Sequence, residues 1–134
     1  MDEKCRKDVI ELHRFFENWF TGRVARTQKE FARIRDTLAA DFEIISPSGT
    51  RTRRAELLAG IWEAYGSYTS ESFGIRIGNV ACRRIDDDVC LVTYEEWQTR
   101  DGEEKGRVSS AVFRRREGTP GGIEWQHVHE VWIS

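Results

Sequence analysis

Residues 123–133, Ile-Glu-Trp-Gln-His-Val-His-Glu-Val-Trp-Ile, decide the fold class of this chain. The run is rich in β-branched and aromatic residues, contains no Gly or Pro, and follows the loop sequence Thr119-Pro120-Gly121-Gly122. Such a run predicts a β-strand that begins at a loop. Successive side chains of a strand point to opposite faces, so we expect Trp125, His127 and His129 on one face.

Three further strands are predicted upstream of this one. Apolar residues in strand-like patterns predict strands over 73–85, 89–99 and 107–116. Asp86-Asp87-Asp88 separates the first two, and Asp101-Gly102 lies between the second and the third. Both sequences favour turns. The second half of the chain therefore predicts antiparallel strands joined by hairpins.

The first half of the chain predicts helices. Apolar residues at helical spacing predict a helix over 8–21, a second helix that begins at Thr27 with a capping box, and a third helix capped by Thr52. A short strand, 41–46, lies between the second and third helices. Helices followed by hairpin-linked strands predict an α+β fold in which helices cover one face of the sheet. We expect one domain over 1–134.

Composition and charge limit the function classes. The chain has 134 residues, of which 39% are hydrophobic and 33% charged, and its formal net charge is −2. This balance predicts one globular domain and disfavours nucleic acid as a partner. No apolar run approaches the length of a membrane span, and the N-terminus lacks the apolar core of a signal peptide. We therefore expect a soluble, cytoplasmic protein without a membrane partner.

The three cysteines, Cys5, Cys82 and Cys90, suggest neither a disulfide framework nor a zinc site. Their number is odd and no Cys-x-x-Cys spacing occurs, so a reducing compartment fits best. A cross-strand disulfide between Cys82 and Cys90 is the alternative. We expect no cofactor.

A register assumption groups the polar residues of the strands. If Trp97 pairs with Arg107 across the turn at Gly102, one face of the sheet carries Glu95, Trp97, Arg107, Ser109, Trp125, His127 and His129. The opposite face would then be an apolar partner surface formed by Val92, Tyr94, Val108, Val112, Val128 and Trp132. A slip of one residue would break up both groups.

Arg107 is the predicted anchor for a ligand. Its guanidinium can bind a carboxylate or enolate, with Glu95 orienting it and Trp97 stacked on it. The alternative is a solvated ion pair between Arg107 and Glu95. Trp62, on the third predicted helix, would add to an aromatic pocket wall if helices cover this face.

His127 and His129 allow three interpretations. Their spacing suits a metal site with Glu95 as third ligand, but a metal site needs further ligands that this sequence does not offer, so we predict none. Ligand binding, or hydrogen bonding within a polar cavity, fits the pair better. As an enzyme, the chain would use His127, His129 or Glu95 as general acid or base.

Three stretches resemble a known superfamily. They are Asp41-Phe42-Glu43-Ile44-Ile45-Ser46-Pro47-Ser48-Gly49, residues 107–113 and residues 124–129. The chain resembles the SnoaL-like members of the nuclear transport factor 2-like superfamily, and 124–129 is similar to the association domain of calcium/calmodulin-dependent protein kinase II. The resemblance implies one SnoaL-like domain with a cone-shaped, cystatin-like fold: three helices on a curved, mainly antiparallel sheet, a deep pocket, and a homodimer formed through the outer sheet face.

One position departs from the ketosteroid isomerases of that superfamily. Where those enzymes place an aspartate base before the Pro-x-Gly turn, this chain has Ser46. A serine hydroxyl does not abstract a proton near neutral pH without a neighbouring base, which argues against isomerase chemistry of that type.

Three functions therefore remain open from the sequence. The first is a dimeric protein that binds a small molecule in an aromatic-lined, partly polar pocket. The second is a SnoaL-like enzyme of cyclase, dehydratase or isomerase type. The third is a non-catalytic association module, because this fold carries all of these functions.

Overall fold

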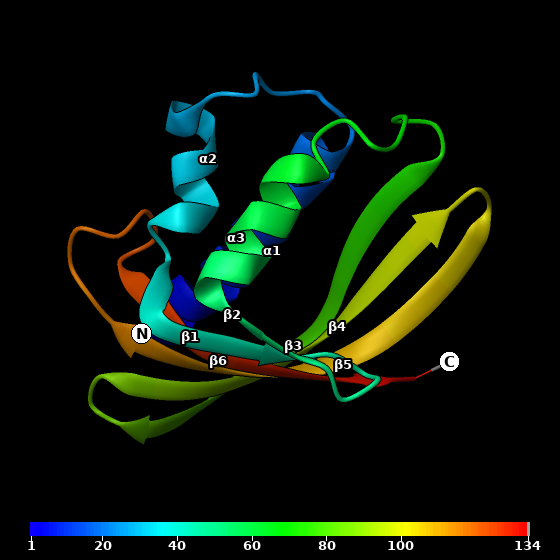
Figure 1. Ribbon diagram of the computed structural model, residues 1–134. Coiled ribbons are helices and arrows are strands. Elements are labelled where there is room, and N and C mark those ends of the chain that lie inside the picture. Colours follow the sequence, from blue (N-terminus) through cyan, green and yellow to red (C-terminus); the bar gives the residue numbers. More distant parts are fainter. Residues whose placement is uncertain (134) are drawn as a thin grey trace.

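A curved sheet with three helices on its concave side forms the protein (Figure 1). The computed structural model describes residues 1–133, and within them six strands form one sheet in the order β2-β1-β6-β5-β4-β3. The elements are α1 (Asp2–Phe20), α2 (Gln28–Arg35), β1 (Leu38–Ile45), β2 (Arg51–Arg53), α3 (Arg54–Glu63), β3 (Phe73–Asp86), β4 (Val89–Arg100), β5 (Glu103–Arg115) and β6 (Ile123–Trp132).

The predicted α+β class is confirmed. The β1–β6 pair is parallel and the other four pairs are antiparallel, so the sheet is mainly antiparallel, as expected. β3, β4 and β5 are joined by the two predicted hairpins. The turn between β4 and β5 is Asp101-Gly102, and both residues have positive φ angles, 50° and 84°. That backbone is typical of a two-residue hairpin turn.

The helix boundaries differ from prediction at two places. α1 begins at Asp2 rather than at residue 8, and the early acidic residues Asp2 and Glu3 suit its N-terminal dipole. Thr27 does cap α2, because its side chain accepts a hydrogen bond from the Glu30 backbone N–H at 3.2 Å. Thr52 does not cap α3: it lies in β2, and the N-cap residue is Arg53.

The assumed register between β4 and β5 is wrong by one residue. The two-residue turn pairs Arg100 with Glu103, so Arg107 pairs with Glu96, and Trp97 pairs with Gly106. Gly106 has a steric reason to be glycine. A Cβ atom there would lie 2.5 Å from atoms of the Trp97 ring, well inside van der Waals contact. The missing side chain thus makes room for the indole.

A β-bulge in β6 separates residues that were expected on one face. Phe113 pairs with Trp125, but Val112 pairs with His127, so Gln126 is one residue extra on the β6 side. The bulge changes the alternation of faces. Trp125 therefore lies on the concave face, and His127 on the convex face.

The predicted apolar partner surface is also divided by this register. Val92, Tyr94 and Val128 are buried on the concave side beneath the helices. Trp132 pairs with Arg107 and lies near its guanidinium, at 5.2 Å from the ring centroid. The convex face keeps Val108 and Val112.

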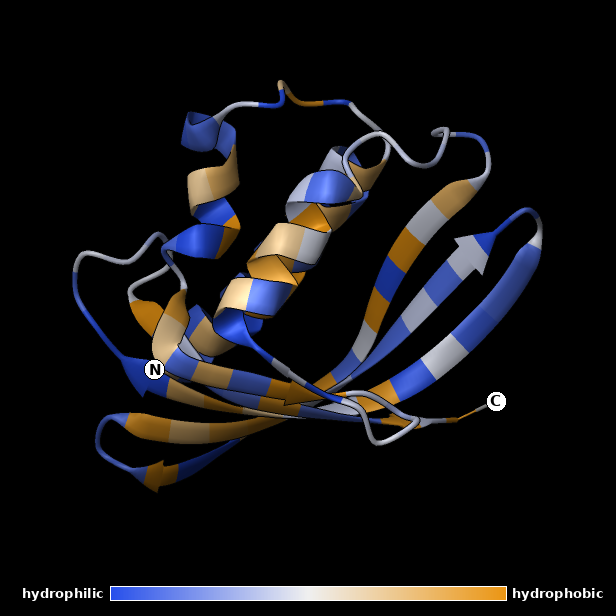
Figure 2. Ribbon diagram, viewed as in Figure 1, coloured by the Kyte–Doolittle hydropathy of each residue, from blue (hydrophilic) through white to orange (hydrophobic). Residues whose placement is uncertain are grey.

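Aromatic side chains join the three helices on the concave side of the sheet, and apolar and polar residues alternate along the elements (Figure 2). Trp19 of α1 is fully buried, and its indole N–H donates to the Ile61 carbonyl of α3 at 2.7 Å. Trp62 packs against Trp19 and Phe31, with ring centroids 5.4 and 5.2 Å away. These contacts join α1, α2 and α3 into one layer.

No described helix combines the length and apolar character that a bilayer crossing requires. Cys5, Cys82 and Cys90 are free thiols, so the cross-strand disulfide is not formed.

The Asp8 carboxylate connects the helical layer to the sheet. It is 1% exposed, and it accepts hydrogen bonds from Arg33 of α2 at 2.5 Å and from the Trp125 indole of β6 at 2.7 Å. The Thr37 hydroxyl lies 3.5 Å from the second carboxylate oxygen. Three segments distant in sequence thus meet at one buried anion.

Replacing Asp8 should destabilise the fold strongly. In Asp8→Asn the largely buried guanidinium of Arg33 loses the closer of its two carboxylate partners and keeps Glu11 at 3.8 Å, so we expect the free energy of unfolding to fall by about 3 kcal/mol. Asp36→Asn is the matched control, because Asp36 pairs with Arg35 at the surface and exposed pairs contribute at most about 1 kcal/mol. Urea denaturation measures both, and equal losses would contradict the anchoring role.

Candidate functional site

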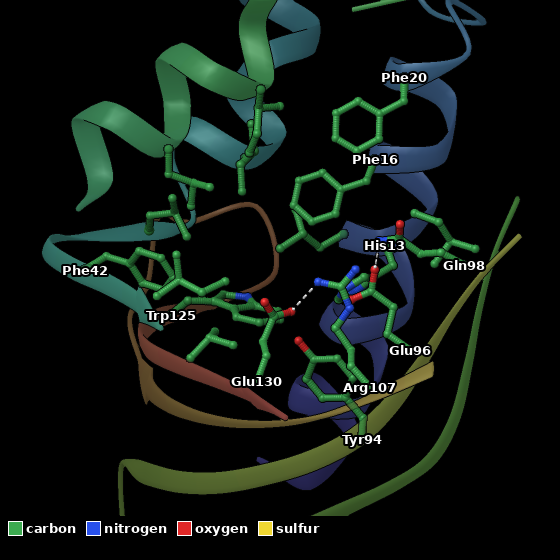
Figure 3. A pocket seen from close by; sticks show the side chains of 18 residues that line it. His13, Phe16, Phe20, Phe42, Tyr94, Glu96, Gln98, Arg107, Trp125 and Glu130 are labelled. Carbon is green, nitrogen blue, oxygen red and sulfur yellow. Dashed lines mark hydrogen bonds and ion pairs between the residues drawn. The ribbon is translucent and has the colours of Figure 1, made fainter. Parts of the chain in front are cut away.

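A cavity of about 250 Å³ lies between the helical layer and the concave face of the sheet (Figure 3). Most of its wall is apolar and consists of Leu12, Phe16, Phe20, Ile34, Leu38, Phe42, Ile44, Leu57, Ile61, Ile75, Trp125 and Val128. The polar side chains of the wall are His13, Tyr94, Glu96, Gln98, Arg107 and Glu130. The polar groups gather on one side of an otherwise apolar space.

His13 and Glu96 form a buried pair across the helix–sheet interface. His13 Nε2 lies 3.2 Å from Glu96 Oε1, and both side chains are at most 7% exposed. The other imidazole nitrogen, Nδ1, lies 2.7 Å from the Val9 carbonyl oxygen. Because a carbonyl only accepts, Nδ1 carries a proton, and Nε2 faces a carboxylate. This geometry suits a doubly protonated, cationic imidazole.

The pKa directions agree with a charged pair. Burial lowers the pKa of His13, but the charge and hydrogen bond of Glu96 outweigh it, and the pKa lies above its usual value. Burial raises the pKa of Glu96, but His13 and Arg107 lower it to about 2. Gln98 adds a hydrogen bond to the same carboxylate at 2.6 Å. Glu96 is therefore an ionised, fully occupied group rather than a base ready to accept a proton.

Arg107 and Glu130 form the second pair of the cavity. Arg107 Nη1 donates to Glu130 Oε2 at 3.1 Å. Burial raises the pKa of Glu130 above its usual value, although Arg107 opposes this. Arg107 Nε is buried and has no hydrogen-bond partner among the described residues. The guanidinium thus keeps donor capacity beyond its one ion pair.

Tyr94 adds a neutral hydroxyl to the same side of the cavity. Burial, and then the negative charges of Glu96 and Glu130, keep the pKa of Tyr94 well above 10. The phenol remains protonated at neutral pH. In Figure 3, Tyr94, Arg107 and the two carboxylates lie together below Phe16 and Phe20.

Two predicted site residues line this cavity. They are Arg107 and Trp125, which β5 and β6 place on the concave face. Ser109 is buried on the same face, where it pairs with Tyr94 across β4 and β5, but it is not part of the cavity wall. Trp62 packs into the aromatic layer of the helices and does not line the cavity.

The other four predicted site residues lie on the convex face, away from the cavity. Glu95 accepts hydrogen bonds from Asn79 at 2.6 Å and from the Trp97 indole at 3.1 Å, and these two contacts lower its pKa. His127 and His129 follow the bulge and pair with Val112 and Ser110. The grouping of Glu95, Trp97, His127 and His129 with Arg107 was wrong. The two-residue turn shifts the register between β4 and β5 by one residue, and the bulge shifts the register between β5 and β6, so these four side chains point to the opposite face.

His13, Glu96 and Glu130 were missed as site residues. The Asp101-Gly102 dipeptide could have predicted that Glu96 lies beside Arg107, because a two-residue turn there pairs these two residues. No comparable signal pointed to Glu130, whose face depends on the bulge. His13 belongs to the buried stripe of α1, but its partner lies 83 positions away in sequence.

Among residues 1–133, no cluster of three or more His, Cys, Asp or Glu side chains could hold a metal ion.

The His13–Glu96 pair predicts a pH-dependent stability. Because the folded-state pKa of His13 lies above the unfolded value of about 6.5, its stabilising charge is fully present below that pH and is lost as the pH rises through the folded-state pKa. The difference in unfolding free energy between wild type and His13→Gln should therefore shrink as the pH rises above about 6.5.

His129→Gln is the control, because His129 is exposed on the convex face. Urea denaturation at several pH values compares the variants. A difference between wild type and His13→Gln that is constant with pH would contradict an ionic pair.

Solved structures similar to this chain share its fold. An NTF-2 like protein of unknown function from Pseudomonas aeruginosa has a TM-score of 0.85 at 19% identity, over 98% of this chain and 99% of that one. The CaMKII hub of S. rosetta has a TM-score of 0.73 at 11% identity, over 98% and 95%. ActVI-ORFA from Streptomyces coelicolor has a TM-score of 0.65 at 14% identity, over 98% and 96%. The predicted nuclear transport factor 2-like, cystatin-like fold is confirmed.

Sequence comparison points to a particular family with this fold. Sucrose-phosphatase 1 of Nicotiana tabacum is 20% identical over 128 residues, which are 95% of this chain but 30% of that protein. The chain therefore spans less than a third of its curated relative. The family model for the sucrose-6-phosphate phosphohydrolase C-terminal region matches residues 5–134, nearly the whole sequence. The chain belongs to the sucrose-6-phosphate phosphohydrolase C-terminal family.

Proposed function

We propose that this chain binds a small, largely apolar molecule that carries an acidic or carbonyl end. The observation that supports this best is Arg107, a largely buried cation in the wall of an apolar cavity, whose guanidinium makes one hydrogen bond, to Glu130, among residues 1–133. An oxygen of the ligand would accept from the free donors of Arg107. Hydrogen bonds to charged groups are stronger than neutral ones, and more so where water is scarce.

The shape and lining of the cavity agree with such a ligand. Its volume, about 250 Å³, is close to the lower end of the range of small-molecule sites. Phe16, Phe20, Phe42 and Trp125 offer flat apolar surface to a ring or chain. Burial of that surface would supply most of the affinity, at roughly 25 cal/mol per Å² before the costs of binding.

An enzyme of cyclase, dehydratase or isomerase type has less support. His127, His129 and Glu95, the residues expected to move protons, lie on the convex face. Inside the cavity, Glu96 is an ionised partner of His13 with a pKa of about 2, which makes it a weak base. Binding requires only the donors that Arg107 keeps free, so we prefer it over catalysis.

Arg107→Gln should abolish most of the response to small carboxylic acids. We expect phenylpropionate to raise the melting temperature of the wild type, and Arg107→Gln to bind it at least about tenfold more weakly, because a charged hydrogen bond is lost. Isothermal titration calorimetry gives the dissociation constants.

Arg76→Gln is the matched control. Arg76 lies near the Trp97 ring, at 5.4 Å, on the convex face. The control should bind like the wild type. A wild type that does not respond to apolar acids, or a response that survives in Arg107→Gln, would contradict the proposed site.

We also propose that two copies associate through the convex face of the sheet. Val108 and Val131, which pair across β5 and β6, are 38% and 57% exposed, and large apolar side chains at the centre of a sheet face are typical of interfaces. The CaMKII hub, whose fold this chain shares, supports the same idea. A non-catalytic association role is compatible with ligand binding, because the two sites occupy opposite faces.

Charged substitutions on the convex face should yield monomers. In Val108→Asp the buried aspartate of a dimer would lack a counter-ion, so association should weaken at least about a hundredfold. Ile85→Asp is the control, because Ile85 is 56% exposed near the end of β3, away from that patch. Sedimentation velocity measures the mass, and an unchanged profile in Val108→Asp would remove this interface.

A further inference from the structure

A second hollow adjoins the cavity on the concave side. Its volume is about 350 Å³, and it is lined by Gln98, Arg100, Glu103, Lys105, Arg107 and Trp132. Gln98 and Arg107 line both spaces, so the hollows meet at these two side chains. We call this second hollow the vestibule.

The vestibule is cationic, in contrast to the cavity. Three of its side chains, Arg100, Lys105 and Arg107, carry positive charge, and only Glu103 carries negative charge. Arg107 forms an ion pair with Glu130. Neither Arg100 nor Lys105 forms an ion pair within 4.0 Å in the described part of the chain. Within residues 1–133, these two cations therefore form no ion pair, and Glu103 is the one carboxylate that lines the same hollow.

Neighbouring groups hold these cations in place. Arg100 donates to the Gln98 side-chain oxygen at 2.9 Å, and its guanidinium lies over the Tyr68 ring, 5.1 Å from the centroid. Lys105 lies over the Trp132 ring at 5.8 Å. Cations fixed in this way lose less conformational entropy when they bind an anion.

A row of polar side chains on two paired strands continues from the cavity into the vestibule. Glu96, Gln98 and Arg100 follow one another on the concave side of β4, paired with Arg107, Lys105 and Glu103 of β5. Residues two apart on a strand are about 7 Å from each other. A ligand that fills the cavity and passes Arg107 thus reaches Lys105 and Arg100 within about one such step.

We propose that the vestibule binds the anionic head group of an amphiphile whose apolar tail occupies the cavity. This inference rests on the proposed function and names the class of ligand: a chain or ring with a terminal carboxylate, sulfonate or phosphate monoester. Arg107 contacts the head from the cavity side, and Arg100 and Lys105 contact it from the solvent side. Trp132, about half exposed, supplies an apolar flank.

Octanoate, octanol and octylamine test the inference, because they share a tail and differ in the charge of the head. Calorimetry on the wild type should show octanoate binding at least about tenfold tighter than octanol, with octylamine weakest. Arg100→Gln and Lys105→Gln should each weaken octanoate binding about three- to fivefold, the range of a partly exposed ion pair. Both should leave octanol binding unchanged.

Arg76→Gln again serves as the control for lost positive charge, and circular dichroism checks that every variant is folded. Octanoate that binds more tightly than octanol to the wild type, and equally well to Arg100→Gln and Lys105→Gln, would overturn the vestibule's role while the proposed function stands. Equal affinities for octanoate and octanol would overturn both. Binding of none of the three probes would overturn both. The anion could instead belong to a sugar phosphate, and sucrose 6-phosphate tests this alternative. If it binds more tightly than octanoate, the vestibule binds a polar sugar phosphate and the amphiphile proposal is wrong.

Discussion

The buried carboxylate of Asp8 is the interaction on which the architecture depends. A single anion receives hydrogen bonds from α2 and β6, so the helical layer cannot shift over the sheet without breaking the bond between Asp8 and the Trp125 indole. The loop before β6 closes over this site. A Cβ atom at Gly121 would lie 2.1 Å from an Asp8 oxygen, and only glycine allows the backbone to approach so closely.

The cavity follows from that anchoring. α1 is held at Asp8 and again at His13, whose partner Glu96 lies on β4. Between the straight helix and the curved sheet a space remains, and aromatic side chains line it without filling it. One ion pair, His13–Glu96, joins the helix to the sheet, and a second, Arg107–Glu130, joins two strands of the sheet, so each charge on the polar side of the cavity has a partner and Arg107 keeps further donor capacity. Packing and binding thus use the same residues.

The sequence predicted the elements better than their faces. Alternating apolar residues and turn dipeptides were enough for β3, β4 and β5, and the capping box located α2, because these signals are local. Face assignments depend on counting every residue between two strands. A turn taken one residue too long moved Trp97 and Glu95 to the wrong side, and nothing local in the sequence reveals the bulge at Gln126. The His13–Glu96 pair joins segments whose proximity only the folded chain determines.

The bulge in β6 also separates positions whose substitution would affect the interior from positions whose substitution would affect the outer surface. Upstream of Gln126, Trp125 belongs to the anchor and the cavity; downstream, His127 and His129 face outward while Val128 and Glu130 face inward. Substitutions at the outward positions can accumulate without touching the interior. One inserted residue therefore lets the same strand evolve its two surfaces independently, so that relatives could change what they assemble with and keep what they enclose.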